Sequence, residues 1–77
     1  MSALNDTELA ILDFEHKRWR YAGAKEQAIK DLFDLSATTY YARLNRLIDR
    51  AEALQQDPML VKRLRRLRDT RRAKRAG

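Results

Sequence analysis

The segment AKEQAIKDLFDLSATTYYARLNRLID, residues 24–49, decides the fold, because its apolar residues recur at the spacing of two short helices. Each predicted helix has one apolar stripe to bury, made of Ala28, Ile29, Leu32 and Phe33 in the first and of Tyr40, Leu44, Leu47 and Ile48 in the second. Only Asp34, Leu35 and Ser36 lie between the two helices. Ser36 is a good N-cap for the second helix, and Leu35 can fill the corner before it. The segment therefore predicts a helix-turn-helix.

The second of these helices has a face that is typical of a DNA-reading helix. Small or hydrogen-bonding side chains, which suit the major groove, point away from the predicted core: Ala37, Thr38, Tyr41, Ala42 and Asn45. Arg43 and Arg46 flank this ridge, so we expect them, together with Thr39, to contact DNA phosphates on its rim. Tyr40 belongs to the buried stripe, whereas Tyr41 is either a DNA contact or a solvated or dimer-facing ring. No arginine points at base edges from the ridge itself, so base specificity should be low to moderate.

The composition excludes several classes of protein. A chain of 77 residues forms one domain and buries only about 60% of its unfolded surface. It has no cysteine and a single histidine, His16, so a zinc site is excluded and we expect neither a metal nor a cofactor. It has no glycine-rich loop, no Ser/His/Asp set and no close carboxylate pair, so we expect no enzyme and no small-molecule substrate. The N-terminal residues show no basic segment followed by an apolar run of signal-peptide length, and no apolar run approaches the roughly 20 residues that span a bilayer, so we expect a cytoplasmic protein.

The formal net charge of +6 is concentrated at one end of the chain. Residues 1–61 carry eight Lys/Arg and ten Asp/Glu, a net charge of −2, whereas residues 62–77 carry nine Lys/Arg and one Asp, a net charge of +8. A cationic end on a near-neutral domain is typical of nucleic-acid binding, although a membrane surface or an acidic protein would also attract it. We expect DNA phosphates to be contacted by Lys62, Arg63, Arg65, Arg66, Arg68, Arg71, Arg72, Lys74 and Arg75.

The residues before the central segment predict one more helix, which covers it. Asn5, Asp6 and Thr7 are three candidate N-caps. The apolar stripe that follows consists of Leu9, Leu12, His16 and Trp19, widened by Ile11 and Phe14. We expect this helix to run to about residue 18, with His16 partly buried at the edge of the core and Trp19 buried near the helix end. Gly23 suits a positive φ, so the corner to the next helix is predicted over residues 20–23.

The residues after the central segment predict a short helical turn within 50–57 and then a basic amphipathic helix. Asp57 as cap and Pro58 at the first helical position mark the start of that helix. Its narrow apolar stripe consists of Leu60, Val61, Leu64 and Leu67. Beyond Asp69 there are no apolar anchors, so we expect a tail that stays flexible until it meets an anion. The chain is thus predicted to be one all-α domain, residues 1–77, of four to five helices, with a basic helix and flexible tail in 62–77.

The stretches AGAKEQAIKDLFDLSATTYYARLNRLID and DPMLVKRLRRLR resemble a family of small actinobacterial proteins of formerly unknown function, and the likeness runs from about residue 8 to 72. One branch of that family is similar to mycobacterial nucleoid-associated proteins. The resemblance implies a helix-turn-helix DNA-binding protein that associates with the chromosome, acts as a transcriptional regulator, or does both. The helix-turn-helix part is similar to the promoter-reading region of sigma factors too, where a serine caps a helix whose fourth residue is buried, as Ser36 and Tyr40 would be. Lys30 and Asp34 depart from that pattern, because a small residue and a turn glycine usually stand there.

The expected function is binding of double-stranded DNA, with the helix after Ser36 in the major groove and the basic helix along the phosphates. The alternative is an adaptor whose stripe of Leu60, Leu64 and Leu67 docks on a protein such as the transcription machinery, with the arginines on its acidic surface. A helix that lies on a membrane surface is a third hypothesis. We also expect a homodimer, through the face around Ile11 or the stripe at 60–67, since a small domain gains stability by burying more apolar surface.

Overall fold

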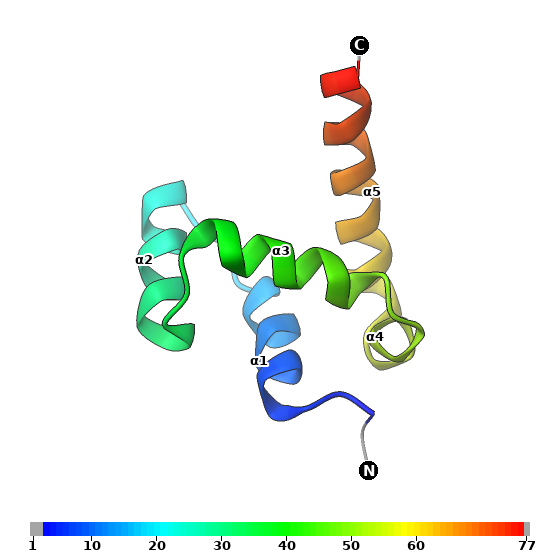
Figure 1. Cartoon of the computed structure of the whole chain (residues 1–77), viewed down its shortest axis with the longest axis horizontal. Helices are drawn as coiled ribbons and strands as arrows, with labels where there is room; N and C mark the ends of the chain where they lie inside the picture. Colours follow the sequence, from blue (N-terminus) through cyan, green and yellow to red (C-terminus); the bar gives the residue numbers. More distant parts are fainter. Residues whose placement is uncertain (1–2, 77) are drawn as a thin grey trace.

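The computed structural model describes residues 3–76, with the side chains of residues 3–73. The described chain forms five α-helices and no strand: α1 (Asp6–Glu15), α2 (Ala22–Phe33), α3 (Ala37–Ile48), α4 (Ala51–Gln56) and α5 (Pro58–Ala76). The predicted all-α fold of four to five helices is confirmed. In Figure 1, α3 crosses the middle of the molecule with α1 below it, α2 stands at one end of α3, and α4 and α5 stand at the other.

Helix α1 begins where the sequence predicts and ends earlier. The Asn5 side chain accepts a hydrogen bond from the Glu8 amide at 2.8 Å, and the Glu8 carboxylate accepts one from the Asn5 amide at 2.9 Å, which is a complete capping box. The helix stops at Glu15, not at residue 18. His16 is exposed, which corrects its predicted place at the edge of the core, because its Nε2 lies 2.5 Å from Asp57 Oδ2, outside the core.

The corner between α1 and α2 spans residues 16–21, so its predicted position at 20–23 is wrong. Trp19 packs its ring 5.4 Å from that of Phe14 and is only partly buried. This contact turns the chain back before Tyr21, whose carbonyl accepts the first backbone bonds of α2 from Ala24 and Lys25. Gly23 therefore lies inside α2, and its φ is not positive.

The turn between α2 and α3 follows the sequence closely. Asp34 ends α2 in the left-handed conformation, with φ 54° and ψ 40°, and its amide donates to the Lys30 carbonyl at 2.9 Å. Aspartate is one of the few residues that adopt this conformation readily, so it does here what the usual turn glycine does. Ser36 caps α3 as predicted, since its Oγ accepts from the Thr39 amide at 3.2 Å. The arrangement is consistent with a helix-turn-helix.

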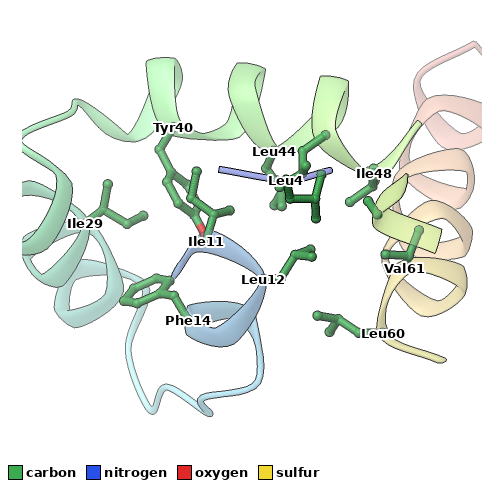
Figure 2. Packing of buried hydrophobic residues seen from close by; sticks show 12 residues of the cluster. Leu4, Ile11, Leu12, Phe14, Ile29, Tyr40, Leu44, Ile48, Leu60 and Val61 are labelled. Atoms are coloured by element: carbon green, nitrogen blue, oxygen red, sulfur yellow. The ribbon is translucent and has the colours of Figure 1, made fainter. Parts of the chain in front are cut away.

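The core lies between α1 and α3 and is closed by α2 on one side and α5 on the other (Figure 2). The predicted stripe of α3 is fully confirmed, since all four of its residues are buried. In α2 only Ile29 is buried, and Leu32 is 59% exposed, so its predicted burial is wrong. The buried residues are Leu4, Ile11, Leu12, Phe14, Ile29, Tyr40, Leu44, Leu47, Ile48, Ala53, Leu60 and Val61. Ile11, at 2% exposure, cannot serve as the predicted dimer surface.

A buried polar cluster ties the first three helices together. The Tyr40 hydroxyl donates to Glu15 Oε2 at 2.5 Å, and Lys25 Nζ lies 3.1 Å from the same oxygen. Tyr40 has no exposed surface and Glu15 is 9% exposed. Burial away from water, followed by the hydrogen bond to Glu15, raises the pKa of the Tyr40 hydroxyl above its ordinary value. Because every member has a partner, the cluster fixes one packing of α1, α2 and α3.

Helix α5 starts as predicted and continues further than predicted. Asp57 Oδ1 accepts from the Leu60 amide at 3.4 Å, and Pro58 is the first helical residue. Leu60 and Val61 are buried, Leu64 is half-buried, and the helix then runs past Asp69 to Ala76. The predicted flexible tail is therefore helical up to Ala76. Arginine, alanine and lysine are strong helix formers, and no glycine interrupts them before residue 77. In Figure 1 this half of α5 projects beyond α3.

Candidate nucleic-acid interface

The outer face of α3 is centred on Ala42 and is shifted relative to the predicted ridge. Thr38 and Ala42 are exposed as predicted, whereas Ala37, Tyr41 and Asn45 are half-buried. Tyr41 and Asn45 are partly covered by side chains of α2 and α5. The Tyr41 ring packs edge-on against Tyr40 at 5.2 Å with Lys25 Nζ 5.3 Å from its centroid, and α5 packs at Asn45. The exposed arc of α3 consists of Thr38, Thr39, Ala42, Arg43 and Arg46.

Helices α3 and α5 form the two sides of a groove of about 630 Å³. Four of the five residues that were predicted to face the DNA major groove line this protein groove. Three of the predicted phosphate contacts line it as well. The α3 side consists of Thr38, Tyr41, Ala42, Leu44, Asn45 and Ile48, and the α5 side of Leu64, Leu67, Arg68, Arg71 and Arg72. Lys25 and Glu15 complete the lining. Lys25 was not among the predicted site residues, since its place depends on the angle between α2 and α3, which no local pattern shows.

The arginines of α5 divide into two groups. Arg71 and Arg72 line the groove, are exposed, and form no ion pair among the described residues. Arg65 and Arg68 bind the end of α3 instead. Arg65 Nε donates to the Ile48 carbonyl at 2.5 Å, and Arg68 Nη1 donates to Asp49 Oδ1 at 2.9 Å. The hydrogen bond to Asp49 raises the pKa of the Arg68 guanidinium, and the charge of Arg68 is already paired. These two predicted phosphate contacts are thus occupied within the protein.

Two further predicted phosphate contacts, Arg43 and Arg46, lie on the opposite flank of the α3 arc. They are exposed and line a second hollow of about 370 Å³, between α3 and the start of α1. Arg50 lies in the same hollow and is paired with Glu8 and Glu52. Among the described residues, arginines without an ion-pair partner therefore lie on both sides of Thr38 and Ala42.

The remaining predicted contacts lie outside both hollows or beyond the described side chains. Lys62, Arg63 and Arg66 are exposed on other faces of α5. Thr39 is exposed, and its Oγ1 accepts from Ser36 Oγ at 3.0 Å. The side chains of Lys74 and Arg75 lie outside the described residues.

The groove combines arginine side chains with hydroxyl groups, an amide and several apolar side chains. Within residues 3–73, no group of three His, Cys, Asp or Glu side chains is placed to hold a metal ion. None of the described helices is long and apolar enough to cross a membrane. What the surface offers is guanidinium groups around the short side chains of Thr38 and Ala42.

Comparison with known proteins identifies a family and nothing more specific. No curated protein and no solved structure matches the chain. The match to a family covers residues 3–76, which is nearly the whole chain. The protein belongs to the family described as "Protein of unknown function (DUF3263)".

Proposed function

We propose that this protein binds double-stranded DNA with low to moderate sequence specificity, as a nucleoid-associated protein, a transcriptional regulator or both. The observation that carries the proposal is the groove between α3 and α5. Two unpaired arginines, Arg71 and Arg72, line it together with Thr38 and Ala42, the exposed residues of the capped helix. In the cell, the cytoplasmic chromosome would be the partner.

We assign the two sets of arginines to the two phosphate strands that border a major groove. Arg43 and Arg46 lie on one flank of the α3 arc, and Arg71 and Arg72 lie on the other. A major groove is about 12 Å wide and has a phosphate strand on each side. When α3 enters the groove, each flank meets one strand, and Thr38 and Ala42 lie against the base edges. The short side chains permit close approach but offer few hydrogen bonds, so sequence discrimination stays modest.

Affinity comes mainly from the phosphate contacts and depends on salt for that reason. Each neutralised phosphate contributes about −0.9 to the slope of log K against log salt concentration, so these four arginines give a slope of about −3.6. Lys74 and Arg75 continue the basic sequence of α5 and would make the slope steeper.

Fluorescence anisotropy on a labelled random-sequence duplex, repeated across a range of salt concentrations, tests the proposal. We expect saturable binding at low salt and a log–log slope of about −3.6 or steeper. A protein that leaves the duplex free at low salt would contradict the proposal. Parallel titrations with AT-rich and GC-rich duplexes measure the specificity, which we expect to amount to about tenfold or less.

An adaptor that docks on a protein is the second candidate, and one observation favours it. Leu67 is 49% exposed and lines the groove beside Leu64, whereas Leu60, the third residue of the predicted docking stripe, is buried in the core. Arg71→Ala and Leu67→Gln, made as separate variants, distinguish the two functions. If the groove receives DNA, the Leu67→Gln variant keeps the parent affinity for duplex within about twofold, since no charge changes. If apolar docking is the function, duplex binding is weak in both proteins and insensitive to Arg71→Ala.

A further inference from the structure

The end of α3 is held by two arginines of α5. The last four carbonyls of a helix have no partner within it, and a cation placed there also interacts favourably with the helix dipole. Arg65 Nε donates to the Ile48 carbonyl at 2.5 Å, and Arg68 Nη1 lies 3.5 Å from the Asn45 carbonyl. The same Nη1 donates to Asp49 Oδ1 at 2.9 Å, on the C-cap residue of α3.

Arg68 is the last residue of α5 with a hydrogen bond to another helix among the described side chains. Its side chain is 15% exposed, whereas residues 69–73 are all exposed. Arg71 and Arg72 follow one turn later on the same face of α5, and both line the groove. The position of this last turn of α5 relative to α3 therefore depends on the bonds of Arg68.

We propose that Asp49 and Arg68, assisted by Arg65, are positioning residues for DNA binding. The pair fixes the angle between α3 and α5, and so holds Arg71 and Arg72 at the distance from α3 that a phosphate strand requires. The inference rests on the proposed DNA binding. It also predicts that an acidic side chain strengthens the binding of DNA, which is itself negatively charged. Asp49 is a negative charge at the border of a DNA interface, and yet it supports binding.

The sign of the Asp49 effect separates positioning from simple electrostatics. The side chain of Asp49 is 58% exposed, so its pair with Arg68 contributes little to the stability of the fold. The N-terminal part of α5 stays packed in the core through Leu60 and Val61, whether or not Asp49 is charged. If Asp49 acted only through its charge, neutralising it would remove repulsion from the phosphates and strengthen binding. If Asp49 positions Arg68, neutralising it weakens binding.

Asp69 supplies a matched control. It also accepts from Arg68, with Nε to Oδ1 at 3.3 Å, and its side chain is 65% exposed. It lies on α5 itself, however, so its bond to Arg68 does not join the two helices. Asp49→Asn and Asp69→Asn each remove one negative charge beside the same arginine, and only the first weakens a link between α5 and α3.

The experiment measures the dissociation constant of a random-sequence duplex for the full-length chain and for both variants, together with their melting temperatures. We expect Asp49→Asn to raise the dissociation constant by about twofold to fivefold, which is the most that an exposed ion pair supplies, while Asp69→Asn leaves it unchanged or lowers it. Melting temperatures should stay close to that of the parent. If Asp49→Asn binds the duplex as tightly as the parent or more tightly, positioning by Asp49 is overturned while DNA binding stands. A parent protein that does not bind the duplex overturns both proposals.

A charge exchange covers the case in which Asp49→Asn also unfolds the chain. The double variant Asp49→Arg, Arg68→Asp keeps the net charge and restores a pair between the helices. We expect its dissociation constant to lie within about threefold of the parent value. A loss of more than about tenfold would mean that Arg68 itself touches phosphate, which contradicts its positioning role.

Discussion

Replacing Glu15 with alanine removes the acceptor at the centre of the buried polar cluster, and the structure sets the size of the effect. Tyr40 is fully buried, so water cannot reach its hydroxyl, and a buried hydroxyl left without a partner costs about 1–3 kcal/mol. Lys25 loses its carboxylate as well, but its side chain is 20% exposed, so water recovers part of that interaction. Together the two losses amount to roughly 2–4 kcal/mol.

This change should be easy to measure in so small a domain. One kcal/mol shifts the melting temperature of a 60–100-residue domain by about 4–8 °C, so Glu15→Ala should lower it by roughly 8–32 °C in thermal circular dichroism. Glu26→Ala, an exposed glutamate on α2, is the control and should stay within about 0.5 kcal/mol of the parent. A melting temperature of the Glu15 variant within about 4 °C of the parent value would refute the argument that this cluster joins the three helices.

Three other changes follow from local geometry. Gly23→Ala should stabilise the protein by about 0.5–1 kcal/mol in urea unfolding, because Gly23 lies within α2 at a negative φ and an added Cβ has nothing within 4 Å; a loss of stability would contradict this reading. Ser36→Ala should cost about 0.5–2 kcal/mol in the same assay, since it leaves the Thr39 amide without its cap, and Ser36→Gly should cost less. Because the pKa of Tyr40 is raised in the fold, only the unfolded chain ionises this tyrosine near pH 10, so its contribution to stability is complete below that pH and is lost above it. From pH 8 to pH 11 the parent should therefore lose about 1.4 kcal/mol more than Tyr40→Phe, and equal losses would show that Tyr40 ionises freely in the folded protein.

The parts of the fold that could be predicted from the sequence depend on neighbours within a few residues. The cap at Ser36, the start at Asp57 and Pro58 and the buried stripe that contains Tyr40 all follow from helical spacing and capping chemistry. Gly23 was misplaced because a glycine marks a corner only when the chain needs a positive φ, and here Trp19 makes the turn before it.

The parts that could not be predicted depend on angles between helices. Nothing in the spacing of the α5 arginines distinguishes Arg65 and Arg68, which bind the end of α3, from Arg71 and Arg72, which are free. The division depends on where α5 crosses α3. For the same reason, Asn45 and Tyr41 seemed to project outwards on an isolated helix, and Glu15 carried no sign that it would meet Tyr40 and Lys25.

The central claim is that DNA lies against the groove between α3 and α5, and a matched pair of double variants tests it most directly. Arg71→Ala/Arg72→Ala removes two charges that line the groove, and Arg63→Ala/Arg66→Ala removes two exposed charges of the same helix that do not. Salt-titrated binding to a random-sequence duplex should show the log–log slope flattened by about 1.8 for the first pair, with the second pair close to the parent. The claim would be contradicted if both double variants lost affinity equally and their log–log slopes flattened equally. All faces of α5 would then contribute alike to DNA binding.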